Sequence, residues 1–289
     1  MFNKASELLD LCKEKNLKIS DIVIEKDVAS GISLENLMAK MKETLEVMKE
    51  SATSGLNKEI ISLSGLTGGN SKKVEDYRKN HKSLSGDFVN SAMAKAFSTS
   101  EVNASMGKIV ACPTAGASGI LPSSMLSAME KLNLSDEDVM KGLFTAAGIG
   151  EIVAKNATVA GAEGGCQAEC GVAAAMAAGA IVEMAGGSPE ASFHAAGFAL
   201  TNVMGLVCDP IGGLVEYPCV LRNASGVVNA LISADLALAG VESPIPFDEV
   251  VEAMYKVGKA LPESLRETAL GGLAATETAK KLTRRLIND

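Results

Sequence analysis

The strongest constraint on the fold of this chain is a hundred-residue stretch that is almost free of charge. Residues 142–241 carry ten charged side chains, half the 21% of the whole chain, and hold four of the six cysteines. Charged residues are rarely buried, whereas small apolar residues often are, so this Ala- and Gly-rich stretch is expected to form the interior. With 289 residues, the chain can bury such a core without disulfides. We expect one domain over residues 1–289, with residues 1–55 as a candidate peripheral helical extension.

Hydrophobic spacing and capping residues predict that most of the chain is helical. Apolar residues three and four positions apart run from Leu37 to Met48 and stop before Gly55, which is the spacing of an amphipathic helix. Three serines precede helical runs, at positions where a hydroxyl can cap a helix N-terminus: Ser33, Ser135 and Ser188. The third of these helices begins with Pro189, carries His194 and is expected to end near Gly205.

The Ala-rich run over residues 171–185 is expected to be a helix that ends at the two glycines after it. Alternating β-branched residues are scarce, and residues 19–24 are the one segment that resembles a strand. We therefore predict an all-α fold. Small side chains let helix axes approach closely and leave room for a bulky guest, so a helical domain packed around a bound group is favoured.

Composition argues against several classes of partner. The net charge of −8 opposes binding to nucleic acid, which depends on surplus Lys and Arg. Aromatic residues make up 3% of the chain, with no Trp, and provide little surface for stacking bases. Two histidines are too few for a zinc site built mainly from imidazoles. No apolar secretion signal opens the sequence, and the Ala-rich run is too short to span a bilayer. We expect a soluble, cytoplasmic protein with reduced thiols and no membrane partner.

Three cysteines stand beside Gly or Pro, where helices end and loops begin: Cys166, Cys208 and Cys219. Cys166 is the best candidate for a metal ligand, because it follows two glycines and precedes a helical pattern. A helix N-terminus favours the thiolate form, which is the form that binds metals. The gaps of 42 and 11 residues match no short general cluster motif, so buried and inert cysteines remain an open alternative.

Several segments resemble the signature of the iron–sulfur L-serine dehydratases. Residues 156–173 read NATVAGAEGGCQAECGVA, residues 208–210 read CDP, and residues 218–224 read PCVLRNA. Later blocks at residues 254–259 and 266–274 match as well. The resemblance covers nearly the whole chain, most strongly from about residue 60, and several blocks in the right order are more specific than any one. The chain resembles the α chain of the two-subunit type of this family.

The resemblance implies that Cys166, Cys208 and Cys219 hold a four-iron, four-sulfur cluster. Three thiolates leave one iron open to act as a Lewis acid, and the implied reaction is β-elimination of water from L-serine to give pyruvate and ammonia. Pyridoxal phosphate is not expected, because no lysine lies in a motif for a Schiff base. Single-chain relatives place a C-terminal cysteine on the open iron, but this sequence ends in Asn288-Asp289, so its resting ligand stays open. Three further cysteines are not required by the family pattern: Cys170, which shares a helix face with Cys166, and Cys12 and Cys112, which we assign to packing.

Two loops rich in Gly and hydroxyl residues, 62–70 and 111–119, are candidates for substrate binding. Glycine permits close backbone approach, and successive backbone N–H groups can hold a carboxylate. Neither loop continues into Gly-Lys-Ser/Thr, so nucleotide phosphate is not expected. By themselves the loops are more typical of plain turns than of a binding site. The resemblance assigns them to the substrate site with these residues: Ser64, Gly65, Thr67, Gly68, Thr114, Gly116, Ser118 and Asn156.

The base that removes the α-proton is not identified by any motif. Glu163 and Glu169 flank Cys166 in the charge-poor region, where burial can raise a carboxyl pKa. The alternative is that they cap helices or pair with Arg222 or Lys155.

The remaining polar candidates point to a partner chain. We expect His194 to be a packed, hydrogen-bonded histidine and His81 to lie on the surface. In relatives a second domain supplies a Ser-Ser-His-Thr element, and neither histidine here has that context, so the resemblance implies a separate β subunit. Two other hypotheses stay open: a cysteine desulfidase-type lyase and a non-catalytic helical protein with structural zinc.

Overall fold

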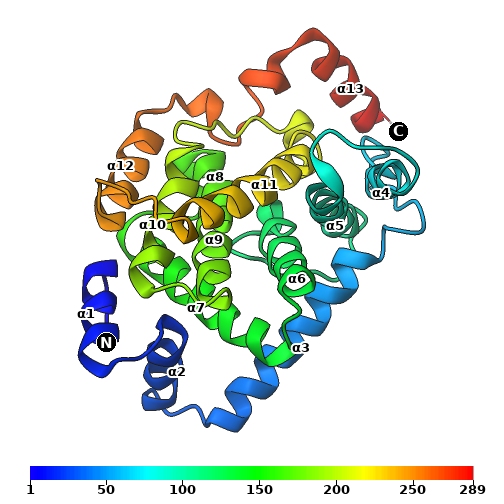
Figure 1. Ribbon diagram of the computed structural model, residues 1–289. Helices are drawn as coiled ribbons and strands as arrows, with labels where there is room; N and C mark the ends of the chain where they lie inside the picture. Colours follow the sequence, from blue (N-terminus) through cyan, green and yellow to red (C-terminus); the bar gives the residue numbers. More distant parts are fainter. Residues whose placement is uncertain (289) are drawn as a thin grey trace.

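The computed structural model describes residues 1–288 and is built from helices (Figure 1). Their bounds are α1 Ala5–Lys15, α2 Ile19–Ala29, α3 Leu34–Thr53, α4 Asn70–Asn80, α5 Gly86–Ala104, α6 Ile120–Leu132, α7 Asp136–Asn156, α8 Gly161–Gly164, α9 Val172–Met184, α10 Pro189–Thr201, α11 Cys219–Leu238, α12 Phe247–Ala260 and α13 Glu277–Asn288. Residues 1–288 contain two isolated β-bridges and no strand, which confirms the predicted all-α class. The strand-like residues 19–24 form the first half of α2.

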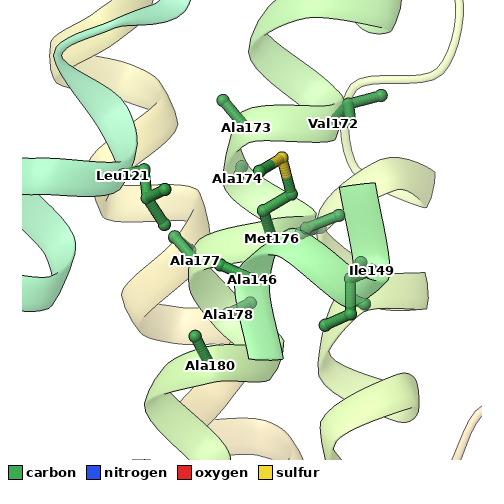
Figure 2. Packing of buried hydrophobic residues seen from close by; sticks show 14 of the residues in the cluster. Leu121, Ala146, Ile149, Val172, Ala173, Ala174, Met176, Ala177, Ala178 and Ala180 are labelled. Atoms are coloured by element: carbon green, nitrogen blue, oxygen red, sulfur yellow. The ribbon is translucent and has the colours of Figure 1, made fainter. Parts of the chain in front are cut away.

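The Ala-rich helix α9 is the centre of the molecule. Every residue from Val172 to Glu183 is buried, and the helix packs against α6, α7, α10 and α11. Figure 2 shows its small side chains against Leu121 of α6 and Ile149 of α7. A Cβ added at Gly179 would lie 2.3 Å from Ile149 Cδ1, so a larger residue would force the two helices apart. The charge-poor stretch is the core because its small residues permit these close helix contacts.

The predicted N-caps are confirmed at three helices. The Ser33 hydroxyl accepts from the Asn36 N–H at the start of α3, and Ser188 caps α10, which begins with Pro189. At α7, Ser135 and Asp138 form a reciprocal capping box, so two backbone donors at the helix start are satisfied. Helix α10 ends at Thr201, a few residues before the predicted end, because a turn already begins there.

The N-terminal helices are fastened to the centre by buried groups. Phe2 and Leu8 are fully buried, and the Glu183 carboxylate of α9 accepts from the Ile19 N–H at 2.9 Å. A carboxylate at a helix N-terminus satisfies donors that the helix itself leaves unpaired. Within residues 1–288, we find no helix that combines the length and apolar character needed to cross a bilayer.

Three breaks in the helical pattern bring cysteines to one region. A π-helical turn at Gln167–Gly171 separates α8 from α9, and such turns occur often at functional sites. Cys219 is the first residue of α11, which packs against α9. Cys208 lies in the loop before α11, where it forms a parallel bridge with Arg266. The fold thus positions thiols from the central helix, the loop and α11 beside the C-terminal segment.

Candidate active site

Four thiols gather near the N-terminal ends of α9 and α11. The Sγ atoms of Cys166 and Cys170 are 3.3 Å apart. The Cys208 thiol donates to Glu169, which lies between these two residues and Thr114, with a sulfur–oxygen distance of 3.8 Å. Cys219 is the first residue of the neighbouring helix α11, and its buried thiol is near enough to feel the charge of Cys166. Three cysteines thus surround one turn, and Cys219 lies at the end of the helix beside it.

The backbone around Cys166 is held by a buried amide that the sequence analysis missed. Gln167 is fully buried, and its Oε1 accepts from the Gly205 N–H at 2.8 Å. Its Nε2 donates to the carbonyl oxygens of Gly164 and Met254 at 2.9 and 3.0 Å. Gln167 thus joins the π-helical turn to α12 and to the loop before Cys208, which fixes the direction in which the Cys166 side chain points.

Cys208 is positioned by the C-terminal segment. Its N–H donates to the Leu265 carbonyl at 2.9 Å, and its carbonyl accepts from the Glu267 N–H at 2.7 Å. The adjacent Asp209 carboxylate accepts from the Leu273 N–H at 2.6 Å and pairs with Arg222 at 2.7 Å. The segment at residues 266–274, which carries one of the sequence blocks that resemble the family, therefore contacts the loop that carries Cys208.

The Arg222 guanidinium lies near the Cys166 thiol. Hydrogen bonds from Cys170 and Cys208, together with the nearby Arg222 guanidinium, hold the pKa of Cys166 well below its usual range. Hydrogen bonding to Cys166 and burial raise the pKa of Cys170 and of Cys208, and burial raises the pKa of Cys219 to about 12. Among these thiols, Cys166 is therefore the one whose anionic form is most favoured.

The donor set fits a cluster better than a single metal ion. Among the residues that the structure describes, no three His, Cys, Asp or Glu side chains converge on one metal position. The thiolates of a four-iron cluster each bind a different iron atom, so their sulfur atoms surround the cluster and do not meet at one metal position. The thiols come from three segments and are soft, mostly buried ligands. Nη1 of Arg222 is buried without a hydrogen-bond partner within residues 1–288, which leaves it available to an anionic group placed among the thiols.

The two candidate glutamates lie in different environments. Glu163 is exposed on the surface. Glu169 points to the thiols: its Oε2 lies 3.8 Å from Cys208 Sγ, and its Oε1 accepts from the Thr114 hydroxyl at 2.8 Å. Burial, followed by the charges of the Cys166 thiolate and Glu267, raises the pKa of Glu169 to about 7.

A glycine makes room for the Glu169 carboxylate. A Cβ added at Gly161 would lie 2.4 Å from Glu169 Oε2 and 3.1 Å from Cys208 Sγ. Neither glutamate takes the alternative partners considered for it, since Arg222 pairs with Asp209 and Lys155 pairs with Glu151.

The loop 62–70 is fastened to the residues before Cys219. The Ser64 hydroxyl donates to Glu216 Oε2 at 2.7 Å, and Glu216 is a buried carboxylate that the sequence analysis did not single out. A Cβ added at Gly68 would lie 2.6 Å from the Ile60 carbonyl oxygen, so this close turn requires glycine. The loop and the start of α11 enclose a hollow of about 360 Å³, whose walls include Gly65, Thr67, Gly68, Lys73, Tyr217 and Leu221.

The loop 111–119 is fastened to α11 as well. Asn223 Nδ2 donates to the Gly116 carbonyl at 2.7 Å, and Asn223 Oδ1 accepts from the Gly119 N–H at 2.8 Å. Thr114 binds Glu169, and the Ser118 hydroxyl is buried without a partner among the described residues. Both predicted loops therefore meet α11 close to Cys219.

The remaining candidates lie elsewhere. The Asn156 amide, which was predicted to neighbour the substrate, donates to the carbonyl oxygens of Asn3 and Ile152, so it binds the N-terminal segment rather than the thiols or either loop. His194 Nδ1 accepts from the Ser243 N–H at 3.1 Å, and His81 is exposed on the surface. Two further thiols, Cys12 and Cys112, are buried.

Comparison with known proteins agrees with this arrangement. The sequence profile of the family described as "Serine dehydratase alpha chain" matches residues 14–274. The chain is 53% identical to the L-serine dehydratase alpha chain of Peptoniphilus asaccharolyticus, with 100% of this chain and 99% of the relative aligned. It is 49% identical to the probable L-serine dehydratase alpha chain of Bacillus subtilis over 99% of this chain and 95% of the relative. It is 37% identical to the L-serine dehydratase of Helicobacter pylori, over 95% of this chain but 62% of that relative.

Proposed function

The chain belongs to the serine dehydratase alpha chain family, and from this membership we propose that it is the catalytic α subunit of an L-serine dehydratase. The reaction is β-elimination of water from L-serine, followed by tautomerisation and hydrolysis of the aminoacrylate to pyruvate and ammonia. The observation that carries the proposal is the convergence of thiols, one cation and two Gly-rich loops at the start of α11.

We assign the ligands of a four-iron, four-sulfur cluster to Cys166, Cys208 and Cys219. When bound, the cluster supplies a Lewis-acidic iron at which a serine hydroxyl becomes a better leaving group. The assignment is supported by the arrival of these thiols from three separate segments and by Arg222, whose charge offsets that of an anionic cluster. Cys112 is outside the assignment because it lies in the loop 111–119, where its Sγ donates to the backbone carbonyls of Val110 and Ser118.

The chain's own residues bind and orient the substrate. We propose that backbone N–H groups and hydroxyls of the two loops, including that of Ser118, hold the serine carboxylate and so fix the α-carbon relative to the thiols. We propose Glu169, rather than the exposed Glu163, as the acidic side chain that moves a proton, because its carboxyl lies between Thr114 and Cys208.

A β subunit is the proposed partner. Two of the most similar relatives are named as alpha chains, and this chain spans about three-fifths of the single-chain relative from Helicobacter pylori. The remaining two-fifths of such an enzyme would then belong to a second chain. Neither His194, which is bound to Ser243, nor the exposed His81 provides an imidazole beside the thiols.

Anaerobic reconstitution tests the proposal. The purified chain is supplied with iron and sulfide, mixed with its β partner, and assayed for pyruvate from L-serine and from L-cysteine. We expect L-serine turnover only with both chains present. Full activity of the chain alone would refute the need for a β subunit, and faster release of sulfide from L-cysteine would favour a desulfidase. Cys166→Ser should abolish activity, whereas Cys12→Ser, which alters a buried thiol far along the chain, should retain it.

A further inference from the structure

Cys170 is a buried thiol that the proposed function does not use. It is 4% exposed and lies one helical turn after Cys166, which is 2% exposed. The two Sγ atoms are in direct contact, 3.3 Å apart. Cys166 is the N-cap residue of the π-helical turn that contains Cys170, so the two residues are neighbours along a single turn. A modest rotation of the two side chains would therefore bring the sulfur atoms to bonding distance.

We propose that Cys166 and Cys170 are an oxidative modification site, which forms a reversible disulfide when the chain holds no metal group. The oxidant is a small disulfide, which is itself reduced. The Cys166 sulfur attacks it and releases one small thiol, and the Cys170 sulfur then attacks the mixed disulfide at Cys166 and releases the second. The pair loses two electrons and two protons, and one small disulfide becomes two small thiols.

The contacts favour Cys170 over the other thiols as the partner of Cys166. Cys170 shares a π-helical turn with Cys166, so their separation is fixed by local structure. Cys208 is bound through its backbone to Leu265 and Glu267, and its sulfur also lies against Glu169. A bond from Cys166 to Cys208 would break the thiol contact with Glu169 and join two tertiary segments, whereas a bond to Cys170 joins residues of one turn.

The disulfide would prevent iron from binding, because the Cys166 sulfur would no longer be free. This consequence rests on the proposed function, because it requires Cys166 to be a cluster ligand. A chain that loses its cluster would then be stored as a disulfide rather than progress to irreversible sulfinic acid. It would regain the ability to bind iron and sulfide only after reduction of the pair.

Peptide mapping of the metal-free chain tests the bond itself. The full chain is reduced, freed of iron by a chelator without air, treated with 2-hydroxyethyl disulfide, and alkylated. A protease that cleaves after Glu separates the thiols. Cleavage places Cys166 in peptide 164–169, Cys170 in 170–183 and Cys208 in 191–216, through the sites at Glu163, Glu169, Glu183, Glu190 and Glu216. We expect peptides 164–169 and 170–183 to be joined, with a mass two hydrogens below the sum of the two, and to separate on reduction.

Either of two results would overturn the proposal: peptide 164–169 joined to 191–216, or both peptides fully alkylated after the oxidation. Cys170→Ala and Cys112→Ala are the matched variants, since both remove one buried thiol. Iron and sulfide uptake by the oxidised wild type and by Cys112→Ala should be lost until a reductant is added. In Cys170→Ala the second exchange has no attacking thiol, so peptide 164–169 should instead carry the mixed disulfide with 2-mercaptoethanol, whereas Cys112→Ala should give the same joined peptides as the wild type. A joined pair without any effect on iron uptake would leave the disulfide standing and count against Cys166 as a ligand.

Discussion

Asn223 offers the sharpest test of how the fold builds the site. Its side chain is 1% exposed and joins α11 to the loop 111–119 through the Gly119 N–H and the Gly116 carbonyl. Asn223→Ala leaves the buried Gly119 N–H and the partly buried Gly116 carbonyl without this partner. Each such group costs about 1–3 kcal/mol, so we expect the free energy of unfolding to fall by about 3 kcal/mol. Urea denaturation of the metal-free chain measures this loss.

The same substitution should also impair catalysis, because the loop carries Thr114, which binds Glu169. We expect KM for L-serine to rise about tenfold, equivalent to about 1.4 kcal/mol of binding. Asn229→Ala is the matched control. Asn229 lies on the same helix, is also buried, and bonds to Asn202 and to the Ala199 carbonyl, remote from the loop.

The control separates positioning from general stability. Asn229→Ala should destabilise the chain by a similar amount and leave KM unchanged at temperatures where both variants are folded. The reasoning fails if the two variants raise KM equally, since the effect would then come from lost stability alone. It also fails if Asn223→Ala unfolds at lower urea but binds L-serine as tightly as the wild type.

Two further predictions concern the room that Gly161 leaves for Glu169 and the ion pair between Glu75 and Arg78. Gly161→Ala introduces a Cβ that would lie 2.4 Å from Glu169 Oε2, so we expect kcat to fall at least tenfold with little change in the helical circular dichroism signal; an unchanged kcat would show that the carboxyl can move without consequence. Hydrogen bonds from Arg78 lower the pKa of Glu75 to about 2. As the pH falls, the Glu75 carboxylate takes up a proton in the unfolded chain before it does so in the folded chain. The ion pair with Arg78 therefore contributes its full stabilisation above about pH 4.5, and this contribution disappears as the pH approaches 2. Glu75→Gln should cost about 2 kcal/mol at pH 7 and progressively less below pH 4.5, measured by urea unfolding, and a constant difference across that range would contradict the assigned charge.

The predictable part of the fold is local in sequence. Ser33, Ser135 and Ser188 cap helices as expected, because an N-cap hydroxyl and its backbone partner lie three residues apart. The core was predictable from its lack of charge, since α9 has no exposed face. The predicted end of α10 was late, because a glycine further along the chain does not show where the last helical hydrogen bond is made.

The unpredictable part of the site depends on contacts between distant segments. Gln167 bonds to Met254 and Ser64 to Glu216, and no spacing rule links residues so far apart. For the same reason, sequence alone gave Glu163 and Glu169 equal standing, although the first is exposed and the second faces the thiols. The charge-poor stretch does carry one sign of such contacts. A polar side chain buried there, such as Gln167 or Asn223, must form hydrogen bonds, so its presence predicts a residue that positions neighbouring segments.

The central claim, that three thiols bind an iron–sulfur cluster, is tested most directly by metal and sulfide analysis of the anaerobically purified chain. The account predicts about four iron and four acid-labile sulfide ions per chain, lost in each of Cys166→Ser, Cys208→Ser and Cys219→Ser and retained in Cys12→Ser. Zinc without sulfide, or iron that survives all three substitutions, would contradict it.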